Sequence, residues 1–149
     1  MRRFIFALAV LIAISGCSKK TDSETGKIDG KWNVVSITEN ANSRILLPPA
    51  GLATAPFLSF SDGNFSGASP ANQIGEGEFT LVDSAGIRFK GFSSTQVGEG
   101  EFGKAMFEVL MSCQIQSLAP CTPAQITWDG TDRISINGRF RYTLNMERD

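Results

Sequence analysis

The chain has 149 residues, with 14 Lys and Arg against 15 Asp and Glu, a formal net charge of −1 and no histidine. The length suits a single domain. The near-even charge argues against nucleic-acid binding, which calls for a concentrated basic face. Histidine is the side chain that enzymes use most often to transfer protons near neutral pH, so its absence argues against acid–base catalysis.

The first seventeen residues carry a processing signal. Two arginines precede an apolar run at 4–14, which is shorter than the roughly 20 residues of a transmembrane helix. Ile14-Ser15-Gly16-Cys17 resembles the lipobox of bacterial lipoproteins. The resemblance implies a signal peptide at 1–16, removed by cleavage, and a Cys17 that carries palmitate-type acyl chains. An ordinary secretory signal and an uncleaved anchor helix are the alternatives.

The residue after the cysteine bears on localisation. It is Ser18, whereas aspartate is the usual inner-membrane retention signal of such lipoproteins. We therefore expect a protein anchored by its lipid to the outer membrane and facing the periplasm, with the leaflet left open. Residues 18–29 are polar and predict a flexible tether, so residues 30–149 form the predicted domain.

The domain opens with strand-like patterns. Residues 30–37 alternate, with Trp32, Val34 and Ser36 expected to face inward. The segment 39–56 contains three prolines and predicts a long loop. Asp62-Gly63 is a hairpin turn signal between short strands at 57–60 and 65–67, and turn chemistry accounts for Asp62. After a loop at 69–75, a second hairpin joins 77–82 to 86–92.

A change of period marks a helix. Apolar residues recur at three-and-four spacing from Glu101 to Ile115, which predicts one amphipathic helix packed on the sheet. Strands follow at 125–128, 133–136 and 139–146, with turn signals at Asp129-Gly130 and Asn137-Gly138. The fold class is therefore α+β: an antiparallel curved sheet or partial β-barrel of seven or eight short strands with one packed α-helix.

Two cysteines remain once Cys17 is acylated. An exported chain lies in an oxidising compartment, so we expect a disulfide between Cys113 and Cys121. The chain-entropy relation gives such a short loop about 2 to 3 kcal/mol of stabilisation. A metal or redox pair is the alternative, but the spacing fits neither and a chain without histidine offers few zinc ligands. We expect no metal and no cofactor.

The order of elements resembles the META/HslJ-like domain, an exported bacterial family often carried on lipoproteins. The resemblance covers residues 30–146 and rests on Gly30-Lys31-Trp32, on 58–67, on Asn72 with the glycine-rich stretch into Phe79, and on Ser93-Ser94-Thr95 before the helix. Family members often have cysteines near the positions of Asn72 and Thr95, where this chain has none. The resemblance implies that Asp62, Asn72 and Thr95 are structural loop residues first and a possible binding surface second.

The residue types favour a binding function over a catalytic one. We expect no enzyme, although Glu76, Glu78, Glu99 and Glu101, in the repeated pentapeptides 75–79 and 98–102, could approach as paired carboxylates. The leading hypothesis is a monomeric, non-catalytic envelope lipoprotein that binds an envelope protein or an apolar ligand and supports integrity or stress tolerance. One alternative is a carrier with a cavity lined by Phe57, Phe60, Phe79 and Phe89. The other is an inhibitor of a secreted hydrolase that inserts the 39–56 segment.

Overall fold

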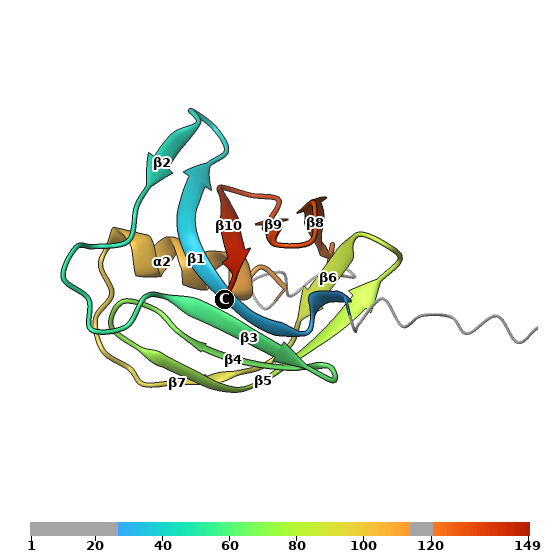
Figure 1. Ribbon diagram of the computed structural model, residues 1–149, viewed down its shortest axis with the longest axis horizontal. Coiled ribbons are helices and arrows are strands. Elements are labelled where there is room, and N and C mark those ends of the chain that lie inside the picture. Colours follow the sequence, from blue (N-terminus) through green and yellow to red (C-terminus); the bar gives the residue numbers. More distant parts are fainter. Residues whose placement is uncertain (1–26, 114–120) are drawn as a thin grey trace, which may run out of the picture.

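The computed structural model describes residues 27–113 and 121–149 (Figure 1). The predicted signal peptide, Cys17, most of the predicted tether and Ile115 lie outside the described residues. Within those ranges, no helix is both long and apolar enough to cross a membrane.

Ten strands and one helix make up the described chain. The helix is α2, Glu101–Leu110. The strands are β1 Gly30–Glu39, β2 Arg44–Leu46, β3 Phe57–Ser61, β4 Asn64–Ala68, β5 Gln73–Val82, β6 Gly86–Phe89, β7 Ser93–Ser94, β8 Ala124–Asp129, β9 Arg133–Asn137 and β10 Tyr142–Arg148.

Eight of the strands close into an antiparallel barrel. Their order is β1, β3, β4, β5, β6, β8, β9 and β10, and β10 pairs back with β1. The predicted curved antiparallel sheet with one packed helix is confirmed, but the barrel is closed and the strand count is ten. The two extra strands are short: β2 pairs with β1 inside the segment predicted to be a long loop, and β7 pairs with β5.

The helix lies against one side of this barrel. It packs against β10 and β1, and its Phe107 ring lies 5.8 Å from the ring of Phe92, which follows β6. Its predicted apolar stripe is buried: Phe102, Ala105, Met106, Val109 and Leu110. The helix therefore packs on β1 and β10 and also reaches Phe92 in the segment after β6.

Phenylalanine rings fill the barrel interior. The rings of Phe60 and Phe79 meet edge to face at 5.2 Å between centroids, and those of Phe65 and Phe89 do the same at 5.2 Å. All four side chains are buried. Phe57 is half-buried and lies outside this cluster, because Leu58 and Phe60 occupy the inward positions of β3. The ammonium of Lys31 lies over the Phe57 ring.

A bulge changes the inward pattern of β1. Val34 pairs with Met146 and Ser36 with Asn145, so Val35 is an extra residue and is exposed. A bulge shifts the alternation by one position. Ile37 is consequently buried where Ser36 was expected to face inward.

The folded domain begins before the predicted boundary. Ile28, assigned to the tether from its polar surroundings, is fully buried. The indole Nε1 of Trp32 donates to the Ile28 carbonyl at 2.7 Å, and the Arg148 guanidinium donates to the carbonyls of Lys27 and Asp29. One isolated apolar residue gives no periodic signal, which is why the sequence pattern missed it.

Two hairpin signals had different outcomes. At the β3–β4 turn, Asp62 and Gly63 both have positive φ, as a two-residue type I′ turn requires, so that prediction is confirmed. The Asn137-Gly138 signal does not form such a turn, because Asn137 pairs with Thr143 across a longer loop. Positive φ there falls on Arg139, at 66°. A Cβ on Gly138 would meet Val109 of α2 at 3.1 Å, so this glycine permits close helix packing.

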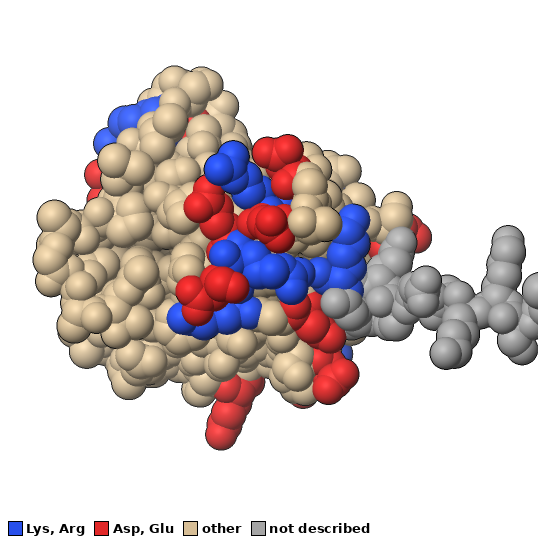
Figure 2. All heavy atoms as spheres, in the orientation of Figure 1, with Lys and Arg blue, Asp and Glu red and all other residues tan. Residues whose placement is uncertain are grey.

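Charges of both signs are interspersed on the face shown in Figure 2. Around the C-terminus, Lys31 pairs with Asp149 at 2.7 Å and Arg133 with Glu147 at 3.1 Å. The hydrogen bond from Lys31 is the main cause that lowers the pKa of Asp149, with a second bond from Asn33 adding to it. This face has no single-sign field of the kind that steers nucleic acid.

We expect Gly77→Ala to destabilise the barrel. A Cβ at residue 77 would lie 2.4 Å from the Phe65 ring, so the ring must leave its place in the aromatic cluster. Overpacking of this kind costs about 1 to 3 kcal/mol. Urea denaturation measures the loss. Gly91→Ala is the matched control, since nothing lies within 4 Å of a Cβ there; equal effects of the two substitutions would contradict the packing account.

Candidate binding groove

The structure brings together two of the three loop residues carried over from the family resemblance. Asn72 lies in the turn between β4 and β5, and Thr95 follows β7. The Thr95 hydroxyl donates to Asn72 Oδ1 at 3.1 Å. Asp62 belongs to the β3–β4 turn and shares no contact with them. Cys17 lies outside the described residues.

The Asn72 side chain holds the segment before α2 in place through hydrogen bonds. Its buried side-chain amide donates to the carbonyl of Val97 at 2.8 Å and to Glu99 Oε1 at 2.7 Å, while its Oδ1 accepts the backbone N–H of Val97 at 2.7 Å. Every polar position of this amide is therefore used inside the protein. Leaving a buried polar group without its partners is costly, so Asn72 fixes the path of residues 95–99 rather than offering groups to a ligand.

Glu99 continues this network to the start of the helix. Its Oε1 also accepts the hydroxyl of Ser69, and its Oε2 is buried without a hydrogen-bond partner among the described residues. A Cβ on Gly103 would lie 1.8 Å from Oε2, so Gly103 makes room for the carboxylate against the first turn of α2. The N-cap residue, Gly100, supplies no side-chain cap. A carboxylate at this end of a helix is favoured by the helix dipole.

The segment held by this network forms one wall of a surface groove of about 460 Å³. Ser94, Thr95 and Val97 contribute to that wall. The exposed side of α2 forms the other, with Lys104, Phe107 and Met111. Val97 is 59% exposed and Met111 36% exposed, so two large apolar side chains that line the hollow are open to solvent. The groove is thus an apolar surface on a fixed scaffold, with charged groups at its rim.

Three of the four glutamates of the pentapeptide repeat have separate partners. Glu78 pairs with Lys90 at 3.4 Å, Glu99 is held by Asn72 and Ser69, and Glu101 pairs with Arg44. Among residues 27–113 and 121–149, no group of three or more Cys, Asp or Glu is placed to hold a metal ion.

The arm formed by β2 and its turn is attached to the same end of the helix. Arg44 pairs with Glu101 and, at 3.2 Å, with Glu39. Hydrogen bonds from Asn42 and then from Arg44 lower the pKa of Glu39, and the bond to Glu101 is the main cause that raises the pKa of Arg44. Ile45 and Leu47 are exposed on this arm.

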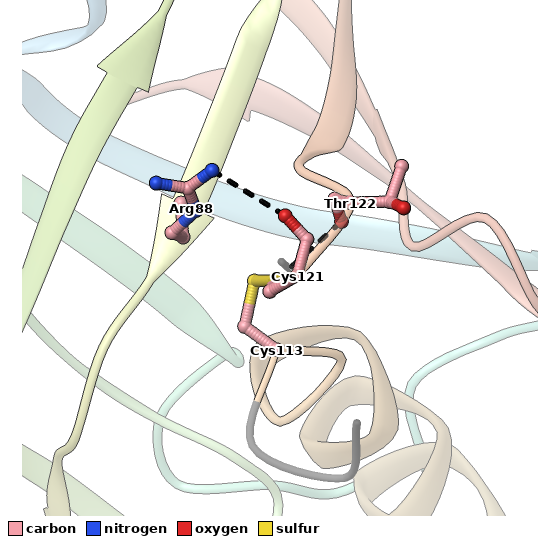
Figure 3. Close-up of a disulfide and its surroundings, with 4 residues drawn as sticks. All are labelled: Arg88, Cys113, Cys121 and Thr122. Carbon is pink, nitrogen blue, oxygen red and sulfur yellow. Dashed lines mark hydrogen bonds between the residues drawn. A yellow bond between two sulfur atoms is a disulfide. The ribbon is translucent and has the colours of Figure 1, made fainter. Parts of the chain in front are cut away.

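The remaining cysteines lie at disulfide distance, with Cα atoms 5.1 Å apart (Figure 3). Cys113 follows α2, and Cys121 precedes β8. The guanidinium of Arg88 on β6 donates to the Cys121 carbonyl at 3.3 Å. β6 and β8 share two residue pairs, Gly86 with Gln125 and Ile87 with Ala124. The disulfide and Arg88 thus reinforce the narrowest junction of the barrel.

Sequence reasoning missed Glu99, Gly103 and the groove. The repeated pentapeptide included Glu99 only as one of four glutamates that could form paired carboxylates, and gave no indication of its hydrogen bonds to Asn72 and Ser69. A glycine two residues into a predicted helix was the available signal, since glycine weakens a helix unless close packing requires it. Val97 and Met111 gave no signal, because residues that far apart in sequence become neighbours only in the fold.

The comparisons with known proteins concern the fold. The chain is similar to the NMR structure of a protein from Burkholderia xenovorans, with a TM-score of 0.60 and 16% sequence identity, covering 100% of this chain and 99% of that one. At this identity the likeness shows a shared fold alone. No protein-family model and no curated protein matches the chain.

We expect Gly103→Ala to destabilise the native chain by about 1 to 2 kcal/mol, because displacing Glu99 costs charge-assisted hydrogen bonds. In a Glu99→Ala background the same change should stabilise by about 1 kcal/mol, since alanine is the better helix former. Urea denaturation of the four proteins measures this coupling. Gly98→Ala serves as a control, because no atom lies within 4 Å of a Cβ there. The same effect in both backgrounds would show that Gly103 and Glu99 act independently.

Proposed function

We propose that the chain is a non-catalytic lipoprotein of the bacterial cell envelope that binds an apolar, extended segment of another envelope protein in the groove beside α2. The observation that carries this proposal is the pair of exposed apolar side chains, Val97 and Met111, facing a hollow whose wall is fixed by Asn72. A wall held in place before binding reduces the conformational entropy that binding must overcome.

The shape of the groove favours a peptide over an enclosed small molecule. Sites for small ligands bury most of the ligand surface, whereas this groove is open along one side. β7 supports the same choice. Ser94 lines the groove, and β5 is the one strand neighbour of β7 among the described residues. An extended segment can pair with a free strand edge while its side chains enter an adjacent apolar groove.

The filled barrel weighs against the carrier alternative. Phe60, Phe79 and Phe89 contact one another in the interior, at the place where a carrier would hold its ligand. One observation favours the alternative of a hydrolase inhibitor. The β2 arm projects from the barrel (Figure 1), and its Ile45 and Leu47 side chains are exposed.

Position also supports an anchored binding domain. The described chain begins at Lys27 on one side of the molecule, and the connection from β7 to α2 lies on the opposite side (Figure 1). The groove therefore lies away from the side on which the described chain begins (Figure 1), which is compatible with access to it in a protein anchored through Cys17. The resemblance to META/HslJ-like domains fits such an exported, non-catalytic protein.

Lipidation is tested on the full chain produced in a bacterial host. We expect intact-mass spectrometry of membrane-extracted protein to show an acylated Cys17 as the first residue. Cys17→Ser should move the protein from the membrane fraction to the soluble fraction, with unchanged thermal stability of the domain. An unmodified amino terminus at Met1 would refute the anchor. A co-purifying lipid-like ligand would support the carrier instead.

The groove is tested by placing a photo-reactive amino acid at Val97 in living cells. We expect a defined protein adduct, and Met111→Lys in the same chain should lower its yield about tenfold, as loss of roughly 1.4 kcal/mol of binding predicts. The matched control places the probe at Thr127, an exposed position of β8. Equal adducts from both positions, or a yield that Met111→Lys leaves unchanged, would contradict a groove-specific partner.

A further inference from the structure

A second hollow, of about 680 Å³, lies between the β2 arm and the β9–β10 loop. Thr38, Asn40 and Ser43 form the wall on the arm side. The other wall comes from β8, the end of β9 and the loop, and includes Gln125 and Arg139. Its lining is mainly polar and shares no residue with the groove beside α2. It is therefore a separate candidate site of different chemistry.

Several polar groups here have no partner among the described residues. The amide of Asn40 is used internally, donating to Asn137 Oδ1 at 3.3 Å and accepting from Thr143 at 2.7 Å. The Ser43 hydroxyl, the Gln125 amide and the Asn137 NH₂ group make no such bonds. A neutral set of donors and acceptors, held by an internally bonded asparagine, suits a ligand rich in hydroxyl groups.

Arg139 adds one positive charge. Its side chain has no acidic partner in the described chain, whereas Arg141 nearby pairs with Glu39 at 3.6 Å. No acidic residue lines the hollow. A guanidinium binds carboxylates through paired hydrogen bonds, so the site has one place for an anionic group.

The backbone of Arg139 has an uncommon conformation. Its φ is 66°, a region that non-glycine residues rarely adopt, although Gly138 directly precedes it. The Asn137 side chain accepts the backbone N–H of Arg139 at 2.7 Å and supports this conformation. Strained conformations of this kind concentrate at binding and catalytic sites.

Phe140 adds an aromatic ring to the lining of the hollow. It lines the same hollow and is 56% exposed, an aromatic surface beside the free hydrogen-bonding groups. A sugar ring has hydroxyls at its rim and apolar C–H faces that pack on aromatic rings. We propose that this hollow binds an acidic saccharide, with its carboxylate on Arg139, its hydroxyls on Gln125, Asn137 and Ser43, and a ring face against Phe140. This site goes beyond the proposed function of the groove.

Other ligands fit the lining less well. A simple anion would use Arg139 and leave the amides and Phe140 without a role. An apolar ligand would desolvate the free amides without replacing their hydrogen bonds. A single unpaired guanidinium is too little positive charge for nucleic acid. The acidic saccharide alone uses the charge, the neutral polar groups and the aromatic ring together.

The test is an NMR titration of the full chain in detergent micelles, read from backbone amide shifts. The probe is the disaccharide of N-acetylglucosamine and N-acetylmuramic acid. We expect saturable shifts at Gln125, Asn137 and Phe140. Neutral diacetylchitobiose, which lacks the carboxylate, should bind at least tenfold more weakly. A 3-deoxy-octulosonic acid disaccharide is the second acidic probe, and the tighter of the two acidic probes assigns the source to cell-wall glycan or to lipopolysaccharide.

Variants separate the roles of the residues. Arg139→Gln and Phe140→Ala should each weaken binding about tenfold, while Arg133→Gln, at the opposite end of β9, should leave it unchanged. Met111→Lys should also leave it unchanged, so failure here and failure of the groove are distinguishable. Absence of saturable shifts, equal binding of the neutral sugar, or equal binding of lactate alone would overturn the proposal.

A further variant shows whether Arg139 is merely structural. Arg139→Gly removes the cost of positive φ and should raise the melting temperature by a few degrees. It should nevertheless lower the affinity for the muramic acid disaccharide at least tenfold. Stabilisation with unchanged binding would overturn the assignment of Arg139 to the carboxylate.

Discussion

The hydrogen bonds of the buried Asn72 amide are the interaction on which the wall of the groove depends. They satisfy four main-chain and side-chain groups of the segment that runs from β7 to α2, and through Glu99 they reach the first turn of the helix. Without the amide, this segment would lose the hydrogen bonds that hold Val97 and Glu99 beside the start of α2.

The strand pairings that close the barrel differ in length. β1 and β10 share an extensive ladder, whereas β6 and β8 meet over two residue pairs. The Cys113–Cys121 pair and Arg88 lie at this junction, while the apolar stripe of α2 packs against β10 and β1. The exposed side of the helix is consequently free to form the groove. Packing on the barrel and formation of the groove thus use different faces of the same helix.

Sequence patterns predicted the parts of the fold that local chemistry determines. The helix stripe and the Asp62-Gly63 turn follow from periodicity and backbone preference. The errors have other causes. Ile28 is buried, and its carbonyl accepts a hydrogen bond from Trp32. Ile37 is buried because Val35 forms a bulge in the ladder between β1 and β10. The loop after Asn137 is longer than a two-residue turn, and its Gly138 lies close to Val109 of α2. The last two depend on elements distant in sequence.

The site was harder to predict for the same reason. Asn72 and Thr95 could be chosen by resemblance, but their chemical role required knowing that Val97 and Glu99 lie beside them. Arg139 could not be distinguished from the other exposed arginines, because neither its backbone conformation nor its lack of an acidic neighbour is visible in the sequence.

The pairing of β1 with β10 has a consequence for biogenesis. Trp32 lies opposite Arg148, so the first strand of the domain finds its main neighbour more than a hundred residues later. Contacts this distant in sequence slow folding and cannot form until the later strand is present. A chain that is threaded across a membrane in an extended state would therefore remain without a closed barrel until residues 142–148 had emerged. If the chain is exported as proposed, the barrel closes only after residues 142–148 have crossed the membrane.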